Sequence, residues 1–291
     1  MRISVVIATK DRAEYLGRAL ESLGKQIGAP SFEVVVVDNG SSDATAQVVE
    51  RARSVLPFDI TYLFEKEPNR GAARNRGIAR ASGYLLLFVD DDVYAPPGLL
   101  AAHEAAHRTN DLVVVGPILN VSSYEERRRP TLANYSRAFF CTCNVSVPHA
   151  AVDAVGGFDE RFDLYGWEDT ELGVRLRENG MRGHFAWDAY LWHVKPPAST
   201  TLEGEIQKTI EKARMAARFV RKNPSPRVRS ATGAHAANLL RGRAIEPLLP
   251  FYAGIAADDR FPAALRALAR AQLLDGVYTQ ELAQALHRSP K

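Results

Sequence analysis

Three consecutive aspartates, Asp90, Asp91 and Asp92, directly follow the apolar run 84–89, which has the composition of a fully buried strand. Three like charges at the end of such a strand raise the free energy of the fold unless a cation or hydroxyl groups bind them. Alternate residues of an extended chain point to the same side, so Asp90 and Asp92 can face one site. We interpret the triplet as a site for Mg²⁺ or Mn²⁺ shared with substrate phosphates. The alternative is an acidic turn that caps the next helix.

The first part of the chain alternates strand and helix patterns, which predicts a parallel sheet with right-handed crossovers. The expected strands are 3–8, 32–38, 60–64 and 84–89, and the expected helices are 14–25, 44–54 and 71–81. The turn 39–43 and the aspartate triplet then fall on the carboxyl edge of the sheet, where open α/β folds bind ligands.

The remaining elements divide the chain into an α/β domain and a helical appendage. Residues 99–107, 150–155 and 169–179 are expected helices, and residues 112–120 and 139–147 are expected strands. From residue 201 onwards only helical patterns occur, at 203–221, 228–241, 244–255, 263–274 and 279–287. We expect an α/β domain over 1–198, with a nucleotide-binding half at about 1–120 and an acceptor half at about 121–198, followed by a helical region over 199–291.

The composition is that of an ordinary globular protein, with 46% hydrophobic and 24% charged residues. The net charge of +3 is too small to predict nucleic-acid binding. No apolar run approaches the ~20 residues of a membrane span, and the start of the chain has the pattern of a first strand rather than a signal peptide. Cys141 and Cys143 would point to opposite faces of a strand, so we expect two buried thiols in a reducing cytoplasm rather than a disulfide.

Six motifs occur in a fixed order within the first two thirds of the chain. They are VVIATKDR at 5–12, VVVDNGSSD at 35–43, GAARNRG at 71–77, VDDD at 89–92, GFDERF at 157–162 and WEDTE at 167–171. Together they resemble family 2 glycosyltransferases of the GT-A fold, which has a mostly parallel, Rossmann-like sheet flanked by helices. The resemblance implies a hexosyltransferase that uses a divalent metal and moves a sugar, with inversion, from a nucleoside-diphosphate sugar to a hydroxyl of a glycan, a lipid-linked or a small-molecule acceptor.

The resemblance assigns the first motifs to the nucleotide. Thr9 and Asp11 would flank the base, and Arg74 would contact the base or a phosphate. Asp38 would accept a hydrogen bond from an N–H of the base, which favours the imide of uracil or thymine and hence a UDP- or dTDP-sugar. Guanine also offers an imide-like N–H and stays an alternative. The alternative for Asp38 is a turn residue that binds its own backbone.

The resemblance also divides the triplet. Asp90 would bind the ribose hydroxyls, Asp92 would ligate the metal, and Asp91 would do either or support a neighbour. His193 matches the histidine that completes the metal site in several GT-A enzymes, and imidazole with carboxylate favours Mn²⁺ over Mg²⁺. The alternative for His193 is a structural role.

The acidic pair Glu168 and Asp169 matches the family's carboxylates before a helix. Asp169 would accept the proton of the attacking hydroxyl, and Glu168 would bind the acceptor or a sugar hydroxyl. Helix capping is the alternative for Asp169. One displacement with one base implies inversion at the anomeric carbon.

Three further residues are expected around the donor sugar or the acceptor. Asn144 would bind a hydroxyl or simply pack in a strand, Gly157 would shape the floor of the site, and Trp167 would form a platform under a sugar or belong to the core.

Basic residues gather in two places. Residues 208–243 contain ten Lys and Arg against one acid, Glu211, which fits peripheral contact with the anionic inner face of a membrane, recognition of an acidic glycan, or an ordinary basic surface. The loop 122–130 with Arg127, Arg128 and Arg129 would close over the diphosphate or remain solvated.

Two other classes of protein are alternatives to a transferase. A sugar nucleotidylyltransferase would carry a glycine-rich phosphate loop near its N-terminus, but residues 8–11 contain no glycine. A non-catalytic module that binds glycans or membranes would not need the triplet, the acidic pair and His193 together. We therefore favour the transferase.

Overall fold

The computed structural model describes residues 2–66, 69–195 and 201–288. The chain divides into two compact units, of which the first comprises 1–163 and 168–197 and the second comprises 164–167 and 198–291. Residues 164–167 thus belong with the helical unit, although they precede the expected boundary in the sequence.

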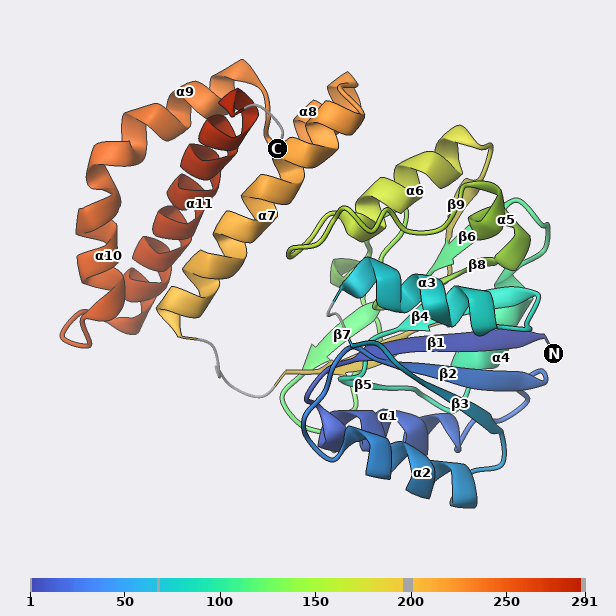
Figure 1. Ribbon diagram of the computed structural model, residues 1–291. Coiled ribbons are helices and arrows are strands. Elements are labelled where there is room, and N and C mark those ends of the chain that lie inside the picture. Colours follow the sequence, from blue (N-terminus) through green and yellow to red (C-terminus); the bar gives the residue numbers. More distant parts are fainter. Residues whose placement is uncertain (1, 67–68, 196–200, 289–291) are drawn as a thin grey trace. The chain divides into compact units, whose positions relative to one another are not determined.

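A seven-stranded sheet in the order β3-β2-β1-β4-β8-β6-β9 forms the centre of the first unit (Figure 1). Its strands are β1 (Ile3–Thr9), β2 (Phe32–Asp38), β3 (Asp59–Phe64), β4 (Leu85–Val89), β6 (Leu112–Val115), β8 (Asn144–Pro148) and β9 (Arg182–Phe185). Strands β1 to β4 pair in parallel, β8 runs antiparallel to both of its neighbours, and β6 pairs in parallel with β9. The sheet is therefore mostly parallel, as the sequence predicts.

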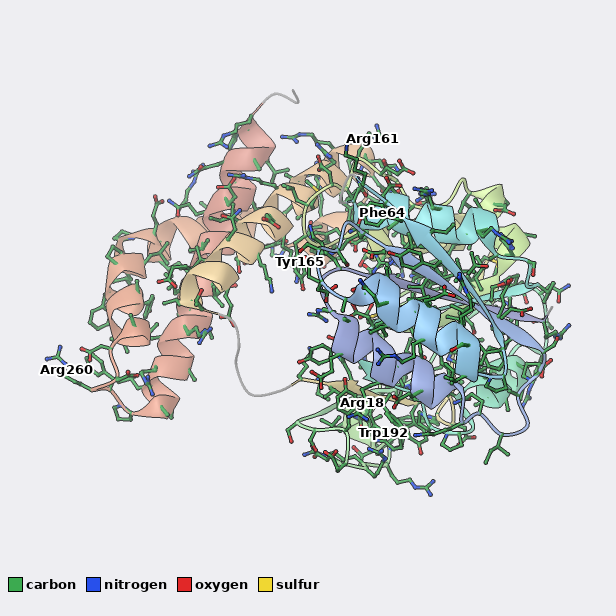
Figure 2. The ribbon with its side chains drawn as sticks, turned by 60° about the horizontal axis from the view of Figure 1, so that its bottom comes forward. Arg18, Phe64, Arg161, Tyr165, Trp192 and Arg260 are labelled. Atoms are coloured by element: carbon green, nitrogen blue, oxygen red, sulfur yellow. The ribbon has the colours of Figure 1, made fainter. Side chains whose placement is uncertain are left out.

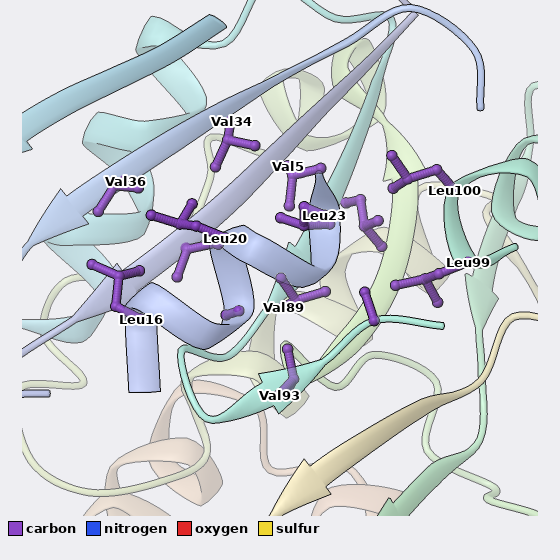
Figure 3. Packing of buried hydrophobic residues seen from close by; sticks show 14 of the residues in the cluster. Val5, Leu16, Leu20, Leu23, Val34, Val36, Val89, Val93, Leu99 and Leu100 are labelled. Atoms are coloured by element: carbon purple, nitrogen blue, oxygen red, sulfur yellow. The ribbon is translucent and has the colours of Figure 1, made fainter. Parts of the chain in front are cut away.

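Helices cover both faces of this sheet. The side chains of each strand alternate between the two faces, and apolar residues on both faces pack against the helices. The helices of the first unit are α1 (Ala13–Leu23), α2 (Thr45–Val55), α3 (Arg70–Arg80), α4 (Leu99–Ala106), α5 (His149–Ala154) and α6 (Glu168–Glu178), with a 3₁₀ turn at Leu132–Asn134. Leu16, Leu20 and Leu23 repeat at helical spacing and pack in the same core as Val5 of β1 (Figure 3). The neighbouring Val6 packs on the opposite side, in one cluster with Ile78 of α3.

A three-stranded sheet in the order β5-β10-β7 lies beside the aspartate triplet. It consists of β5 (Val93–Tyr94), β10 (Leu191–Val194) and β7 (Ile118–Val121). In this sheet His193 pairs with Val93, the residue that follows the triplet, and the N–H of Val194 donates to the carbonyl of Asp92 at 2.8 Å. The short sheet therefore joins two segments that lie a hundred residues apart in the sequence.

Two of the expected strands differ in the structure. The expected strand 112–120 is interrupted at Gly116 and Pro117, which separate β6 from β7. A Cβ on Gly116 would lie 1.7 Å from the carbonyl oxygen of Ala189. The strand is therefore interrupted at a glycine where another segment of the backbone approaches closely. The expected strand 139–147 begins only at Asn144, and the residues before it form a turn.

The second unit contains the helices α7 (Leu202–Lys222), α8 (Pro226–Thr232), α9 (Ala236–Ile245), α10 (Leu249–Ala257) and α11 (Ala263–His287), with a 3₁₀ turn at Glu246–Leu248. The expected helix 228–241 is broken after Thr232 because Gly233 adopts a left-handed conformation with φ +71°. Conversely, α11 runs through the expected gap at 275–278. Gly276 packs closely against Leu249 there, where a Cβ would lie 2.3 Å from a leucine methyl group. Throughout the described ranges, the helices fall short of the length and apolar character that crossing a membrane requires.

The close approach at Gly116 gives a test of the fold. Gly116→Ala should lower the free energy of unfolding by about 3 kcal/mol. The new methyl group would overlap a backbone oxygen, which cannot rotate away as a side chain could. Gly98→Ala, which adds a methyl group to open space, should change it by less than about 0.5 kcal/mol. Urea unfolding followed by circular dichroism measures both, and equal stabilities would contradict the close approach.

Candidate active site

Asp91 is the buried member of the triplet and ties the ends of β1 and β4 together. The hydroxyl of Thr9 donates to Asp91 Oδ2 at 2.7 Å, and Arg12 Nη1 donates to Oδ1 at 3.1 Å. Burial raises the pKa of Asp91 to about 6, although Thr9 and Arg12 act in the opposite direction. Asp91 therefore supports its neighbours, one of the roles that the sequence left open for it.

Asp92 faces the three-stranded sheet. Its Oδ1 lies 2.9 Å from Nε2 of His193, and its Oδ2 accepts a hydrogen bond from Arg12 at 2.7 Å. Burial favours the neutral acid, but His193 and Arg12 outweigh it and hold the pKa of Asp92 below its ordinary value. Although Oδ1 is buried and close to His193, no group among the described residues satisfies it with hydrogen-bond geometry. An imidazole nitrogen and a buried carboxylate oxygen at this distance can bind one divalent cation together.

Asp90 and His193 also meet a thiol. One ligand atom each of Asp90, Cys143 and His193 lie within 4.8 Å of one another. Cys143 comes from the turn before β8, and Asn144 next to it pairs with Val89 in β4. The pairing of β8 with β4 thus carries Cys143 to the triplet.

Side-chain hydrogen bonds of Asp38 stabilise the turn of the second motif. Asp38 is buried and accepts two hydrogen bonds of 2.7 Å, from the N–H of Ser41 and from the hydroxyl of Tyr62. Burial, followed by the contact with Asp38, raises the pKa of Tyr62. The bond to Ser41 is the turn contact that was the alternative interpretation of Asp38.

Asp11 holds the same turn from the other side. It adopts a left-handed conformation with φ +51°, its Oδ1 accepts from the N–H of Ser42 at 2.7 Å, and its own N–H donates to the hydroxyl of Ser41 at 2.8 Å. The ends of β1 and β2 are therefore fixed before any nucleotide binds.

Arg74 and Glu168 form a buried ion pair. Arg74 Nη1 lies 3.0 Å from Glu168 Oε1, and the two side chains are only 11% and 8% exposed. The guanidinium also lies over the ring of Phe158, 5.5 Å from its centroid. The expected contact of Arg74 with a base or phosphate stays a prediction, since only Nη1 is engaged in this pair. The second oxygen of Glu168, Oε2, is buried and lacks a hydrogen-bond partner within the described part of the chain.

Asp169 has the character of a general base. Burial, followed by the negative charge of Glu168, raises its pKa to about 6. Its Oδ1 accepts a 2.6 Å hydrogen bond from the N–H of Thr170, the next residue, whereas a helix cap binds an N–H two or three residues further on. Capping by this side chain is therefore not what the structure shows.

The segment 141–143 lies between the triplet and the acidic pair. Burial, then the charges of Asp169 and Asp90, raise the pKa of Cys141 to about 11, so both aspartates act on one thiol. Cys141 and Cys143 are free thiols, as expected, but only Cys143 is buried, whereas Cys141 is partly exposed.

Asn144 packs inside the protein. It is fully buried, its amide N–H groups donate to the carbonyls of Pro117 at 3.2 Å and Ala189 at 2.8 Å, and its Oδ1 lies 2.9 Å from His103 Nε2. No amide hydrogen remains for a sugar. The expectation of a sugar contact is therefore replaced by strand packing, the alternative that the sequence left open.

Gly157 and Trp167 also have structural contacts. Gly157 has φ +68°, and a Cβ there would lie 2.6 Å from Asn75 Oδ1, whose amide group binds the N–H and the carbonyl of Phe158. Trp167, with φ +76°, belongs to the second unit, where its indole N–H donates to the carbonyl of Lys212 at 3.0 Å. A role for Trp167 under a sugar has no support in these contacts.

The arginine loop packs on the three-stranded sheet. The Arg127 guanidinium lies 4.5 Å from the ring centroid of Tyr94 and 4.7 Å from that of Trp192, which is labelled in Figure 2. The indole N–H of Trp192 donates to the carbonyl of Arg128 at 3.0 Å. Arg127, Arg128 and Arg129 are nevertheless exposed, which agrees with the solvated alternative, and closure over the diphosphate stays a prediction.

Sequence reasoning missed two contributors to this site, Arg12 and Tyr62. Arg12 stands inside the first motif, so its place beside the triplet could have been inferred from the parallel pairing of β1 with β4. Nothing in the local pattern around Tyr62 indicates its partner, since Asp38 is 24 residues distant in the sequence.

The Arg74–Glu168 pair predicts a large difference between two arginines of one helix. Arg74→Met should lower the free energy of unfolding by about 3 kcal/mol, because it leaves a buried carboxylate without its partner. Arg76→Met removes an ion pair with Glu65 from a side chain that is 47% exposed, and should cost less than about 1 kcal/mol. Denaturant unfolding of both variants at pH 7 measures the difference, and similar losses would argue against a buried pair.

Comparisons with known proteins agree with this geometry. The family model of glycosyl transferase family 2 matches residues 4–159, and that of the N-terminal domain of galactosyltransferase matches residues 128–196. Validoxylamine A glucosyltransferase of Streptomyces hygroscopicus subsp. limoneus is 32% identical over 265 residues, which cover 77% of this chain and 57% of that protein. The glycosyltransferase YfnE of Bacillus subtilis is 28% identical over 273 residues, 72% of this chain and 69% of that protein. The chain thus spans less than two thirds of the length of the first of these relatives.

Solved structures show the same fold. The mannosyltransferase PcManGT of Pyrobaculum calidifontis, in complex with GDP-Man and Mn²⁺, matches with a TM-score of 0.67 and 20% identity over 98% of this chain and 86% of that chain. Residues 1–349 of S. aureus TarS, in complex with UDP-GlcNAc, match with a TM-score of 0.58 and 23% identity over 98% and 91% of the two chains. Because the first family model spans more than half of the sequence, this protein belongs to glycosyl transferase family 2.

Proposed function

We propose that this protein is a metal-dependent, inverting glycosyltransferase that moves a sugar from a nucleoside-diphosphate sugar, UDP- or dTDP-linked, to an acceptor hydroxyl. The observation that carries the proposal is the contact between Asp92 and His193, in which a buried carboxylate oxygen lies 2.9 Å from an imidazole nitrogen.

Asp92 and His193 support the metal part of the proposal. When bound, a divalent cation neutralises the charge that develops on the leaving nucleoside diphosphate. The mixed nitrogen and oxygen donors favour Mn²⁺ over Mg²⁺, and two similar structures, PcManGT and GalNAc-T7, contain Mn²⁺. Arg12 bonds both Asp91 and Asp92, so it orients this edge of the site.

Asp38 supports the choice of base. Both oxygens of its carboxylate retain acceptor capacity besides the bonds to Ser41 and Tyr62, and an acceptor selects the imide N–H of uracil or thymine. Tyr62 covers this carboxylate, so we infer that its hydroxyl moves aside when the base binds. Asp90 would then hold the ribose hydroxyls.

Asp169 would accept the proton of the acceptor hydroxyl as its oxygen attacks the anomeric carbon. A carboxylate with a pKa of about 6 is ionised at neutral pH and is a stronger base than an ordinary aspartate. Glu168, fixed by Arg74, has one free oxygen for a hydroxyl of the acceptor or the sugar. A single displacement at the anomeric carbon inverts its configuration.

The basic residues of the second unit bear on the acceptor. Within the second unit, Arg214 pairs with Glu281 at 2.8 Å and Arg241 with Asp275 at 2.6 Å, so part of the basic charge of 208–243 is neutralised. A cytoplasmic enzyme that touches the inner face of a membrane through the remaining basic residues fits a lipid-linked acceptor.

Asp169→Asn tests the base. Transfer should fall at least about a hundredfold, the usual contribution of a general base, while the affinity for the donor stays the same. In the protein itself, kcat should fall as the pH drops below about 6, since the raised pKa leaves Asp169 protonated there. Product formation against pH, with donor affinity from calorimetry, measures both. A loss of donor affinity at unchanged kcat would contradict the assignment.

His193→Ala tests the metal site. The variant should bind Mn²⁺ about tenfold or more weakly, because one of two protein ligands is removed, and the Mn²⁺-dependent rise in melting temperature with a UDP-sugar should shrink. His149→Ala, which alters a histidine bonded to Gly83 away from the triplet, is the control. Electron paramagnetic resonance measures free Mn²⁺, and an unchanged affinity would remove His193 from the metal site.

A further inference from the structure

Asp90, Cys143 and His193 form a second, chemically different group of ligands beside Asp92. Their ligand atoms lie within 4.8 Å of one another, and they come from three elements: the end of β4, the turn before β8 and strand β10. Cys143 is buried, whereas Asp90 and His193 are half-buried, so the group is covered on the thiol side and open on the other.

A thiolate changes which cation such a group prefers. Mg²⁺ and Mn²⁺ favour oxygen ligands, whereas Zn²⁺ binds thiolate, imidazole and carboxylate and is found in tetrahedral sites built from them. Asp92 and His193 without a sulfur ligand suit Mn²⁺. The same histidine with Cys143 and Asp90 suits Zn²⁺.

We propose that Asp90, Cys143 and His193 form a zinc site that shares His193 with the Asp92 site, so that Zn²⁺ excludes Mn²⁺ and inhibits transfer. The inhibition rests on the proposed function, but the binding of Zn²⁺ does not. The open face of the group leaves the fourth position to water or to Asp92.

The geometry requires a small adjustment. Bonds of about 2.0 Å to nitrogen or oxygen and about 2.3 Å to sulfur place the ligand atoms of a tetrahedral site about 3.3 to 3.8 Å apart. The three atoms are at most 4.8 Å apart. Side-chain rotations that move the ligand atoms of Asp90 and His193 by about 1 Å bring all three atoms within tetrahedral bonding distance of one ion.

Binding releases a proton. Zinc binding replaces the S–H bond of Cys143 with a Zn–S bond, and the proton goes to solvent.

Cobalt substitution tests the site directly, without reference to catalysis. Co²⁺ added to the metal-free full chain should produce a thiolate-to-cobalt charge-transfer band, together with the intense visible bands of tetrahedral cobalt. Cys143→Ser should abolish the charge-transfer band and weaken Zn²⁺ binding about tenfold or more, measured by competition with a chromophoric chelator. Cys141→Ser removes the other thiol of the chain and should keep the band.

Each result has a defined meaning. A band that persists in Cys143→Ser, or zinc affinity unchanged in that variant while its melting temperature matches the parent chain, overturns the site. Zn²⁺ should inhibit transfer in the presence of excess Mn²⁺, and Cys143→Ser should relieve this inhibition. A cobalt band without inhibition would leave the zinc site intact and contradict the shared role of His193 in the proposed function.

Discussion

The site depends on the cost of placing carboxylates at the end of a buried strand. Asp91 is tolerated because Thr9 and Arg12 bond it, and Asp92 because Arg12 and His193 lie beside it. These partners come from the end of β1, the N-cap of α1 and strand β10, so the charges cannot be satisfied unless these elements meet at one edge. The need to satisfy the triplet thus couples the parallel sheet to the short sheet that carries His193.

The sequence predicts the first half of the fold well because its signals are local. The strand 32–38 coincides with β2, and the first three helices differ from their expected ranges by two residues at most. The interruption at Gly116 was missed because its cause is the carbonyl of Ala189, which is remote in the sequence. For the same reason the sequence predicts two helices where α11 is continuous. Gly276, in the expected gap, permits close packing and does not end the helix.

In the candidate site, too, local sequence signals were predictive and contacts between remote residues were not. Residue types and motif order identified the triplet, the acidic pair and His193, which the structure places at the carboxyl edge of the sheet and around the segment 141–143. Side-chain partners were beyond the sequence, since Arg74 reaches Glu168 across 94 positions. Asn144 illustrates the ambiguity of a polar residue in a strand, because only its burial distinguishes packing from ligand binding.

The acidic pair gains its chemistry from a division of charge. Arg74 satisfies one oxygen of Glu168, while the charge of Glu168 adds to burial in raising the pKa of Asp169. The positive charge of Arg74 acts on Asp169 in the opposite direction and lowers its pKa. The buried arginine therefore both positions Glu168 and limits how basic Asp169 becomes, although it need not touch the substrate.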